Sequence, residues 1–400
     1  MSSVRRKRIL ILSRLFPYAP ARGGDMSYSR GLAISFAHVA DVTAVVATNG
    51  VQPDGPVDKD GVRWIVAGAP RKGRMGSVAT RLPNIAWRGQ TTAYTRALAL
   101  ALQEEWDVIV IDHIGSYHVL PQVMAYRARR PATRVSYISH EHEASVRVEK
   151  YAAYGGNPLL RLALKLDGIK VGKAELDLVR SVDLLSLINP DDATLYKAQL
   201  PGVQYVTLTP GYQGNSVVQR QIDASVPRRV VVLGGRESRQ KQVILERWLE
   251  HAAPVFHRAG VEMAVVGPIN DALGDTLSSR YPTVRFMGFV DDIDAFLATC
   301  RASVVADFLG GGFKVRLLTY VFNRLPMFAM KGAVSGLGVS APSAFTEFND
   351  LAALAQGVCE RIDDFDYLNR LQNHAYEGAQ GCFDWADRGV RFLKALDAGR

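Results

Sequence analysis

The chain alternates between short apolar runs and longer segments whose apolar positions recur at helical spacing. In the first half, runs typical of buried strands occupy residues 8–13, 42–47, 62–67, 106–111, 133–139 and 184–188. The segments between them predict a loop and helix at residues 23–37, helices at 92–105 and 121–129, and a long helical stretch from 144 to 182, broken near 155–158. Strands that alternate with helices of about 10–15 residues predict a parallel sheet covered on both faces.

The second half repeats this pattern after a connecting segment. Residues 205–208 predict a short strand, and the Pro- and Gly-containing residues 210–215 predict a linker. Strands are then expected at residues 229–233, 262–266, 284–287, 302–306 and 327–329. Helices are expected at residues 242–259, 291–298, 314–322, 352–362, 367–377 and 385–396. The pattern therefore predicts an α/β protein with two doubly wound, Rossmann-like domains, residues 1–208 and 209–380.

Length and composition agree with two soluble domains. The 400 residues exceed one ordinary core and fit two domains of about 200 residues each. The most apolar stretch, residues 31–53, is interrupted by His38 and Asp41, and no run approaches the roughly 20 residues that cross a bilayer. Residues 9–13 follow a basic start but are too short for a signal-peptide core. We therefore expect a cytoplasmic protein.

Two further compositional features bear on partners. The three cysteines, Cys300, Cys359 and Cys382, are too few and too widely spaced for a metal motif or a disulfide framework, and we expect them to be core residues. The net charge of +9 predicts an anionic partner: nucleic acid, an acidic membrane surface or a phosphorylated substrate. Nucleic acid is disfavoured, because the sequence contains no recognised nucleic-acid-binding module.

Part of the positive charge is concentrated in residues 71–96. This segment contains six basic residues and no acidic one, interleaved with Trp87 and aliphatic side chains. The basic residues are Arg71, Lys72, Arg74, Arg81, Arg88 and Arg96. Such a mixture is typical of a segment that rests on an anionic lipid surface, and it predicts peripheral attachment to the inner face of the plasma membrane. The alternative is a solvated basic loop with a few core anchors.

A candidate phosphate site follows the first strand of the second half. The apolar run that begins at Val230 ends at Gly234 and Gly235, with Arg236 next and Lys241 five residues later. Glycines at the end of a buried strand let a ligand approach the backbone. An arginine grips phosphate oxygens as a fork and a lysine acts as a point charge, so the pair suits a diphosphate. The alternative is two surface charges on an exposed loop.

A second candidate is the glycine run at Gly310, Gly311 and Gly312, followed by Lys314. Three glycines that open a helix expose several backbone N–H groups, and the helix dipole favours an anion there. Lys314 and Arg316 add positive charge. The spacing is not that of a Walker loop. The alternative is a tight strand-to-helix turn.

Polar residues and glycines also follow the strands of the first half, where ligands bind in open α/β sheets. Gly23 and Gly24 lie in the loop after the first strand, and His140 follows the strand at residues 133–139. A histidine there can bond a sugar hydroxyl or be a structural residue. Its neighbours Glu141, His142 and Glu143 invite a metal site, but no further ligand has a recognisable spacing, so we expect no metal.

Asp112 and Asp307 both follow strands. Either could bind a hydroxyl or transfer a proton, and we include Asp112 among the substrate-binding candidates.

These motifs together resemble retaining glycosyltransferases of the GT-B fold, in the family 4-like group of bacterial polysaccharide and glycolipid enzymes that use nucleotide-diphosphate sugars. The resemblance covers nearly the whole chain. The matching segments are residues 16–24, the histidine motif at 139–143, the segment 175–191, the clamp at 235–241, residues 289–292, residues 310–326 and residues 383–385. It implies two Rossmann-like domains facing across a cleft, the first binding the acceptor and the second the nucleotide sugar, with a helix at 381–400 crossing back to the first.

The resemblance also implies roles for individual residues. His140 would contact the transferred sugar, and Arg236 and Lys241 would hold the diphosphate; these three are the candidate catalytic residues. The donor- and substrate-binding candidates are Gly23, Gly24, Asp112, Gly235, Gly310, Gly311, Gly312, Lys314 and Thr319. The implied reaction transfers a sugar to a hydroxyl of a lipid-linked, polysaccharide or other glycan acceptor, with retention and without a metal or other cofactor.

The sequence departs from the family pattern at three positions. The family usually has two glutamates eight residues apart on the donor-site loop and helix, where this chain has Gly311 and Thr319. Gln242 replaces the glycine that usually follows the clamp lysine. Two other functions therefore stay open: a non-catalytic GT-B protein that serves as a binding partner, or another GT-B chemistry such as a nucleotide-sugar epimerase.

Overall fold

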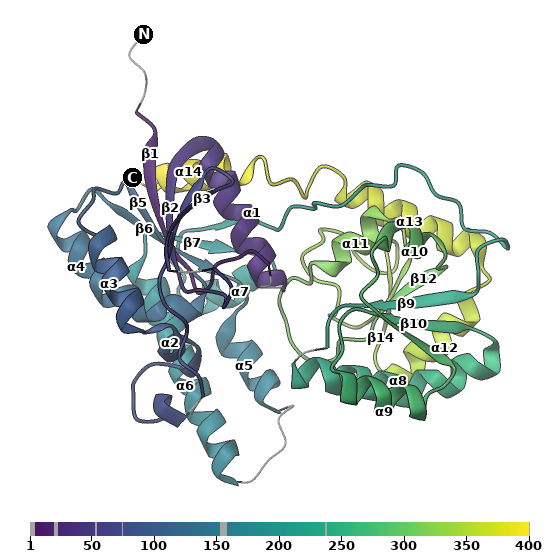
Figure 1. Ribbon diagram of the computed structural model, residues 1–400. Coiled ribbons are helices and arrows are strands. Elements are labelled where there is room, and N and C mark those ends of the chain that lie inside the picture. Colours follow the sequence, from purple (N-terminus) through teal and green to yellow (C-terminus); the bar gives the residue numbers. More distant parts are fainter. Residues whose placement is uncertain are drawn as a thin grey trace. The chain divides into compact units, whose positions relative to one another are not determined.

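The computed structural model describes residues 5–19, 23–52, 54–73, 75–152, 158–236 and 238–399 (Figure 1). The chain forms two compact units. Unit 1 contains the described residues up to Tyr151, residues 158–211 and residues 384–399, and unit 2 contains Ala152 and Tyr212–Phe383. Arg74 of the predicted basic segment, and most of the predicted helix break near residue 155, lie outside the described residues.

Unit 1 is built on an eight-stranded sheet with the order β3-β4-β2-β1-β5-β6-β7-β8. Its strands are β1 (Lys7–Leu12), β2 (Ala40–Val46), β3 (Gly55–Lys59), β4 (Val62–Val66), β5 (Val108–Asp112), β6 (Arg134–Ser139), β7 (Leu184–Leu187) and β8 (Tyr205–Thr207). All neighbours pair in parallel except β3 and β4. Strands β5 and β7 are buried from end to end, as expected for a sheet covered on both faces.

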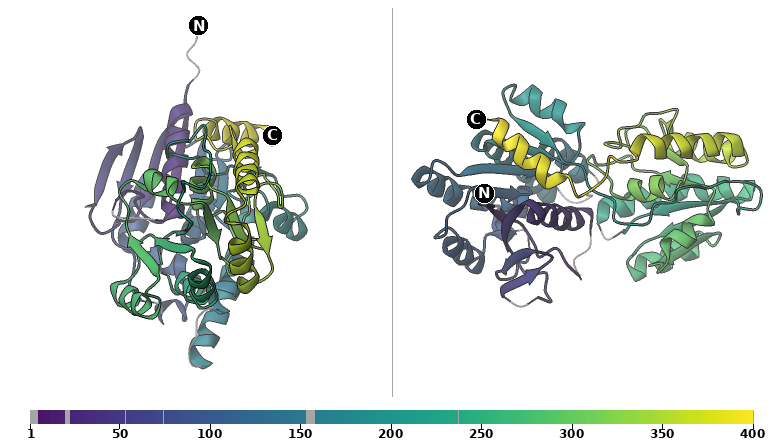
Figure 2. Two further views of the ribbon diagram at one scale, coloured as in Figure 1. Left: turned by 90° about the vertical axis from the view of Figure 1, so that its right-hand side faces the viewer. Right: turned by 90° about the horizontal axis from the view of Figure 1, so that it is seen from above.

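Helices cover this sheet, and the last of them comes from the end of the described chain (Figure 2). They are α1 (Gly24–Val39), α2 (Asn84–Gly89), α3 (Thr92–Ala101), α4 (Leu120–Arg129), α5 (Glu143–Ala152), α6 (Pro158–Ser181), α7 (Asp192–Gln199) and α14 (Arg388–Ala398), with 3-10 turns η1 (Met75–Ser77) and η2 (Ile114–Val119). α14 packs on α1, with the rings of Phe36 and Phe392 4.6 Å apart.

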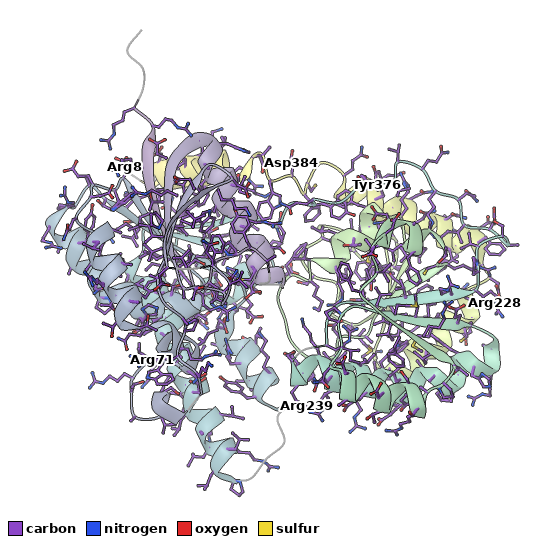
Figure 3. All side chains as sticks on the ribbon, viewed as in Figure 1. Arg8, Arg71, Arg228, Arg239, Tyr376 and Asp384 are labelled. Atoms are coloured by element: carbon purple, nitrogen blue, oxygen red, sulfur yellow. The ribbon has the colours of Figure 1, made fainter. Side chains whose placement is uncertain are left out.

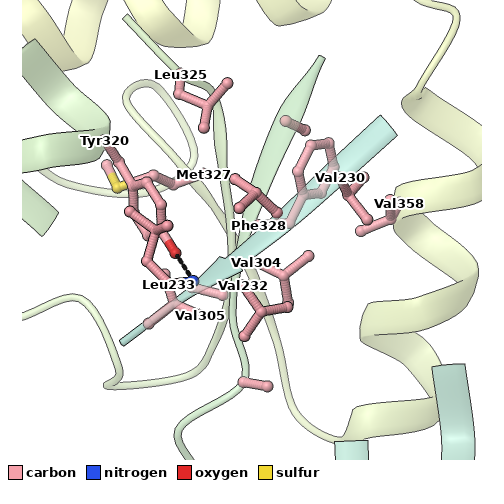
Figure 4. Close-up of a cluster of buried hydrophobic side chains, with 14 of the residues drawn as sticks. Val230, Val232, Leu233, Val304, Val305, Tyr320, Leu325, Met327, Phe328 and Val358 are labelled. Atoms are coloured by element: carbon pink, nitrogen blue, oxygen red, sulfur yellow. Dashed lines mark hydrogen bonds between the residues drawn. The ribbon is translucent and has the colours of Figure 1, made fainter. Parts of the chain in front are cut away.

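Unit 2 is built on a six-stranded parallel sheet with the order β11-β10-β9-β12-β13-β14. Its strands are β9 (Arg229–Leu233), β10 (Glu262–Val266), β11 (Val284–Gly288), β12 (Ala302–Val305), β13 (Met327–Met330) and β14 (Thr346–Phe348). Its helices are α8 (Arg239–Ala259), α9 (Asp271–Arg280), α10 (Ile293–Ala298), α11 (Arg316–Phe322), α12 (Leu351–Arg361) and α13 (Phe365–Ala379). Strand side chains such as Val230, Val304 and Phe328 form its core (Figure 4).

Two Rossmann-like sheets confirm the predicted fold class. The sequence pattern missed β3, β14, α9 and α2, the last a helix of six residues. β3 is an antiparallel edge strand that contains Pro56, so it lacks the buried run that marks the other strands. β14 has three residues, and α9 has one buried residue, Leu277.

In each sheet, later strands are added on both sides of the unit's first strand. In unit 1, β2 lies on one side of β1 and β5 on the other, and in unit 2, β10 and β12 flank β9 in the same way. The crossovers therefore diverge at these points, and ligands of open α/β sheets bind at the carboxyl ends of strands flanked in this way. The candidate residues are found at both of these edges.

Candidate functional site

A buried aspartate organises the edge of unit 1. Asp112 ends β5 and is 2% exposed. One of its carboxylate oxygens accepts hydrogen bonds from Ser13 Oγ at 2.7 Å and from Ser29 Oγ at 2.6 Å. The other lies 2.7 Å from His140 Nε2. Residues that follow β1 and β6 thus converge on the carboxylate at the end of β5, because parallel strands end at the same edge.

The pairing of Asp112 with His140 sets the charge on both groups. Burial disfavours the imidazolium, but the Asp112 carboxylate outweighs burial and raises the pKa of His140. Burial likewise disfavours the carboxylate, but His140 and the two serines hold the pKa of Asp112 below its usual value. His140 is therefore a fixed hydrogen-bonding group whose orientation is set by Asp112, and the structure brings these two predicted site residues together.

The predicted glycines Gly23 and Gly24 stand at the start of α1. Gly23 is the residue before the helix, with φ 135°, and a side chain there would lie 2.7 Å from Asp25 Oδ1. Glycine is therefore required at this turn. Asp25 in turn forms an ion pair with Arg14, the second residue after β1, at 2.6 Å. The helix start is thereby tied to the end of β1.

His113, next to Asp112, is a second buried histidine at this edge. Its φ of 69° is uncommon for a residue with a side chain. Burial, followed by the nearby His140, lowers its pKa well below the usual value, so the ring is neutral. Its Nδ1 accepts the Gly115 N–H at 2.9 Å, which places the proton on Nε2, 3.6 Å from Glu143 Oε1. His113 was not among the site residues predicted from the sequence.

Glu175 of α6 holds the segment that follows His140. Its two carboxylate oxygens accept the N–H groups of Glu143 at 2.8 Å and Ala144 at 2.9 Å, which are the first two of α5. Tyr196 donates its hydroxyl to the same carboxylate at 2.6 Å. A carboxylate at a helix start satisfies N–H groups that have no partner inside the helix. Burial raises the pKa of Glu175 to about 7.

Arg236 is the central residue at the edge of unit 2. It follows β9, is 6% exposed, and donates to the carbonyls of Gly234 and Gly235. Its Nε atom is buried and has no hydrogen-bond partner among the described residues. Burial, and then the charge of Arg316, lower the pKa of Arg236 to about 10. Two guanidinium groups held close together in a buried place form a preorganised site for an anion.

Arg316 comes from the start of α11 and pairs with Asp307, which follows β12. Burial disfavours the Asp307 carboxylate, but Arg316 and then Lys314 keep its pKa below the usual value. A side chain at Gly234, with φ 115°, would lie 3.2 Å from Arg236 Nη1 and 3.6 Å from Arg316 Nη1. The glycine that follows β9 therefore leaves room for both arginines, which are 80 residues apart in the sequence.

The glycine run lies beside the first turn of α8. Gly310 has φ 84°, and a side chain there would lie 2.3 Å from Gln240 Nε2, next to Lys241 in the chain. The structure thus brings the two predicted phosphate motifs of unit 2 together. It corrects one expectation: α11 begins at Arg316 rather than at Lys314, so Gly312 lies four residues before the helix. The run therefore acts as a loop and does not itself form the helix start.

The remaining candidates occupy nearby elements. Lys241 lies in the first turn of α8, where its N–H donates to the Ser238 hydroxyl at 3.4 Å. Thr319 is half-buried in α11. Gly235 packs close to Pro268, which follows β10. Among the described residues, no three His, Cys, Asp or Glu side chains are grouped so as to hold a metal ion. No helix of the described chain is both long and apolar enough to span a membrane.

Nearly the whole chain superposes on solved glycosyltransferase structures. Sucrose-phosphate synthase from Thermosynechococcus elongatus matches with a TM-score of 0.71 and 18% identity, over 98% of this chain and 99% of that chain. The chain has the GT-B fold. The expectation from the sequence motifs is thereby confirmed for the fold.

Two further GT-B structures were solved with nucleotides bound. HepE from Anabaena, in complex with UDP and glucose, matches with a TM-score of 0.59 and 15% identity, over 98% of this chain and 100% of that chain. The catalytic domain of starch synthase IV from Arabidopsis thaliana, bound to ADP and acarbose, matches at 0.62 and 12%, over 99% of both chains. No protein-family model and no curated protein matches the sequence.

Proposed function

We propose that the protein is a glycosyltransferase that moves a sugar from a nucleoside diphosphate sugar to a hydroxyl of a glycan or lipid-linked acceptor. The observation that carries this proposal is the buried guanidinium of Arg236. It lies beside Arg316, its Nε has no hydrogen-bond partner among the described residues, and it follows β9, where the strand order of the unit 2 sheet switches sides. The nucleotide-bound relatives of the same fold support it. We further propose that the protein works in the cytoplasm, retains configuration at the anomeric carbon and needs no metal.

The chemistry follows from where charge develops. As the bond between the anomeric carbon and the diphosphate oxygen breaks, the diphosphate gains negative charge, and the acceptor oxygen bonds to the carbon. The acceptor proton passes to the leaving phosphate, so no protein base is required. Arg236, Arg316 and Lys241 stabilise the growing charge, and fixed cations stabilise it more than they stabilise the bound substrate.

His140 has a different part in this proposal. Its ring is oriented by Asp112 and lies at the edge of unit 1 where ligands of such sheets bind. It would hold a hydroxyl of the transferred sugar. The absence of the family's glutamates at Gly311 and Thr319 removes the carboxylate that usually binds the ribose, so we expect weak discrimination at the ribose hydroxyls.

Thermal unfolding in the presence of UDP, GDP, ADP, TDP and CMP tests the proposal. A ligand present at 100 times its dissociation constant adds about 2.7 kcal/mol of stability. We expect one diphosphate to stabilise the wild-type protein and the effect to vanish in the Arg236→Ala/Lys241→Ala double variant. Arg247→Ala, an exposed residue of the same helix α8, serves as the matched control and should bind as wild type does.

Two other results would redirect the assignment. If no nucleotide stabilises the wild-type protein, the donor-site assignment is wrong and the protein is better regarded as a non-catalytic GT-B partner. If a nucleotide sugar binds but is converted to its free epimer, the reaction is epimerisation, and transfer to an acceptor is excluded.

A further inference from the structure

A stripe of apolar side chains on α6 faces away from the core of unit 1. The stripe consists of Leu159, Leu162, Leu166 and Ile169, which are 77%, 54%, 44% and 49% exposed. Their spacing of three and four residues places them on one face of the helix. Leu164, Val171 and Leu178 lie on the opposite face and are buried. The outward face of a surface helix is normally polar, so this second apolar face indicates an interaction site.

The stripe lies on the part of α6 that extends beyond the body of unit 1. Figures 1 and 2 show the N-terminal half of the helix projecting past the sheet and its other helices. Most of the buried residues of α6, from Val171 to Val179, belong to its C-terminal half. The exposed leucines therefore contribute little to the core of the unit.

Positive charge flanks the stripe. Arg161 and Lys165 are exposed along the same half of the helix, and Lys173 is exposed one turn beyond Ile169. The acidic residue within this half, Asp167, is turned toward the protein, where it accepts the Asn84 N–H at 2.6 Å and the Tyr151 hydroxyl. The surface is thus an apolar helix face with cationic side chains along one side and at its C-terminal end.

The predicted basic segment meets this helix. Lys170 Nζ donates to the carbonyls of Ser77 at 2.8 Å and Val78 at 3.2 Å, which places the loop after η1, with exposed Val78 and Arg81, against α6. Trp87, by contrast, is half-buried, and the guanidinium carbon of Arg71 lies 5.1 Å from the centre of its ring. Arg71 is labelled in Figure 3. The segment therefore contributes charge, while α6 provides most of the apolar contact.

We propose that the α6 stripe and the adjoining loop dock on an anionic lipid membrane. The leucines would enter the boundary between headgroups and acyl chains, and the flanking lysines and arginines would contact lipid phosphates. The charge favours this occupant over a second copy of the chain, because two such helices would bring like charges together at the flanks of their apolar seam. The proposal concerns where the protein works, and it does not depend on the donor that it uses.

Sedimentation with vesicles tests the proposal without any sugar nucleotide. We expect the wild-type protein to bind vesicles of phosphatidylcholine mixed with phosphatidylglycerol at low salt, and to bind pure phosphatidylcholine much more weakly. Leu162→Ser/Leu166→Ser/Ile169→Ser should lower the partition constant by at least about tenfold. Lys165→Glu/Lys173→Glu should lower it on the order of tenfold and flatten its salt dependence.

Matched variants separate this surface from a general loss of apolar area. Leu100→Ser/Val218→Ser/Val390→Ser replaces three exposed apolar residues elsewhere and should bind vesicles as the wild type does. The fluorescence added by Leu166→Trp should be quenched by brominated lipid, whereas that added by Leu100→Trp should not.

Three results would overturn the proposal. The first is no binding of the wild-type protein to anionic vesicles at low salt. The second is equal loss of binding in the α6 and control triple variants. The third is a wild-type dimer that the α6 serine variant converts to a monomer, which would make the stripe a contact between two copies of the chain.

Discussion

At the scale of single residues, the buried carboxyl of Glu175 links stability to pH. It joins α6 to the start of α5, three residues after His140. Burial raises its pKa from 4.5 to about 7, so the folded protein holds a proton that the unfolded chain releases. Raising the pH from about 4.5 to about 7 therefore lowers the free energy of unfolding, and the whole decrease is present above pH 7.

We expect Glu175→Gln to remove this pH dependence. The variant keeps an oxygen for the α5 N–H groups but cannot ionise. Urea unfolding at pH 5 and pH 8 should show the wild type losing more stability than the variant, by on the order of 3 kcal/mol. Glu250→Gln, an exposed residue of α8, is the control. Parallel pH profiles for wild type and Glu175→Gln would show that the carboxyl does not titrate in this range.

Some residues of the site could be predicted from the sequence and others could not. Asp112, His140 and Arg236 stand at the ends of strands or within three residues of them, so a strand pattern alone brings them to the edges of the sheets. The closeness of Arg316 and Asp307 to Arg236 could not be predicted from local sequence, because it depends on β12 lying next to β9. Glu175 lies within a long helix, and no local pattern marks it as the partner of a segment 31 residues earlier.

At the scale of elements, α14 belongs to unit 1 although it follows unit 2 in the chain. Gly389 of α14 lies against α1, where a side chain would come within 2.4 Å of the Ser35 carbonyl oxygen. The contact is with backbone, which cannot move aside as a flexible side chain can. The two helices therefore approach closely only because this residue is glycine.

Gly389→Ala should destabilise unit 1 by about 1–3 kcal/mol, as overpacking of a tight contact does. Gly202→Ala is the matched control, since a side chain there meets nothing within 4 Å and the backbone is not left-handed. Thermal unfolding followed by circular dichroism measures both. Equal stability of the two variants would contradict the tight packing of α14 on α1.

The long helices and buried parallel strands were predictable, because helical spacing and unbroken apolar runs are local properties. β3 was not, since an edge strand with one paired neighbour lacks such a run. The outward apolar face of α6 was also hidden: spacing shows that Leu162 and Ile169 share a face, but only the packing of Leu164 and Val171 shows which face is covered.

At the scale of the whole molecule, the two units differ in how they use the chain. The body of unit 2 comes from the stretch Tyr212–Phe383, whereas unit 1 needs residues 384–399, which follow that stretch in the chain. The connections meet where the Tyr212 N–H donates to the Phe383 carbonyl at 2.9 Å. Phe392 is fully buried in unit 1, so this last segment is part of its core.

We expect residues 212–383 to unfold cooperatively when expressed alone, and residues 1–211 alone to lack a cooperative transition. Adding residues 384–399 to the fragment 1–211 through a flexible linker should restore a cooperative transition, because Phe392 and its neighbours are buried again. Calorimetry of the three fragments provides the measurement. A cooperative, unshifted transition for residues 1–211 would show that α14 is dispensable to unit 1.

The return of α14 to unit 1 also affects how the protein is made. During translation, the strands of unit 1 emerge first, yet their last covering helix emerges only after all of unit 2. Unit 2 can therefore finish folding on the ribosome while unit 1, begun earlier, still exposes the face of α1 around Phe36. The exposed face of a growing chain is where chaperones bind, so this unit is the one that should depend on them.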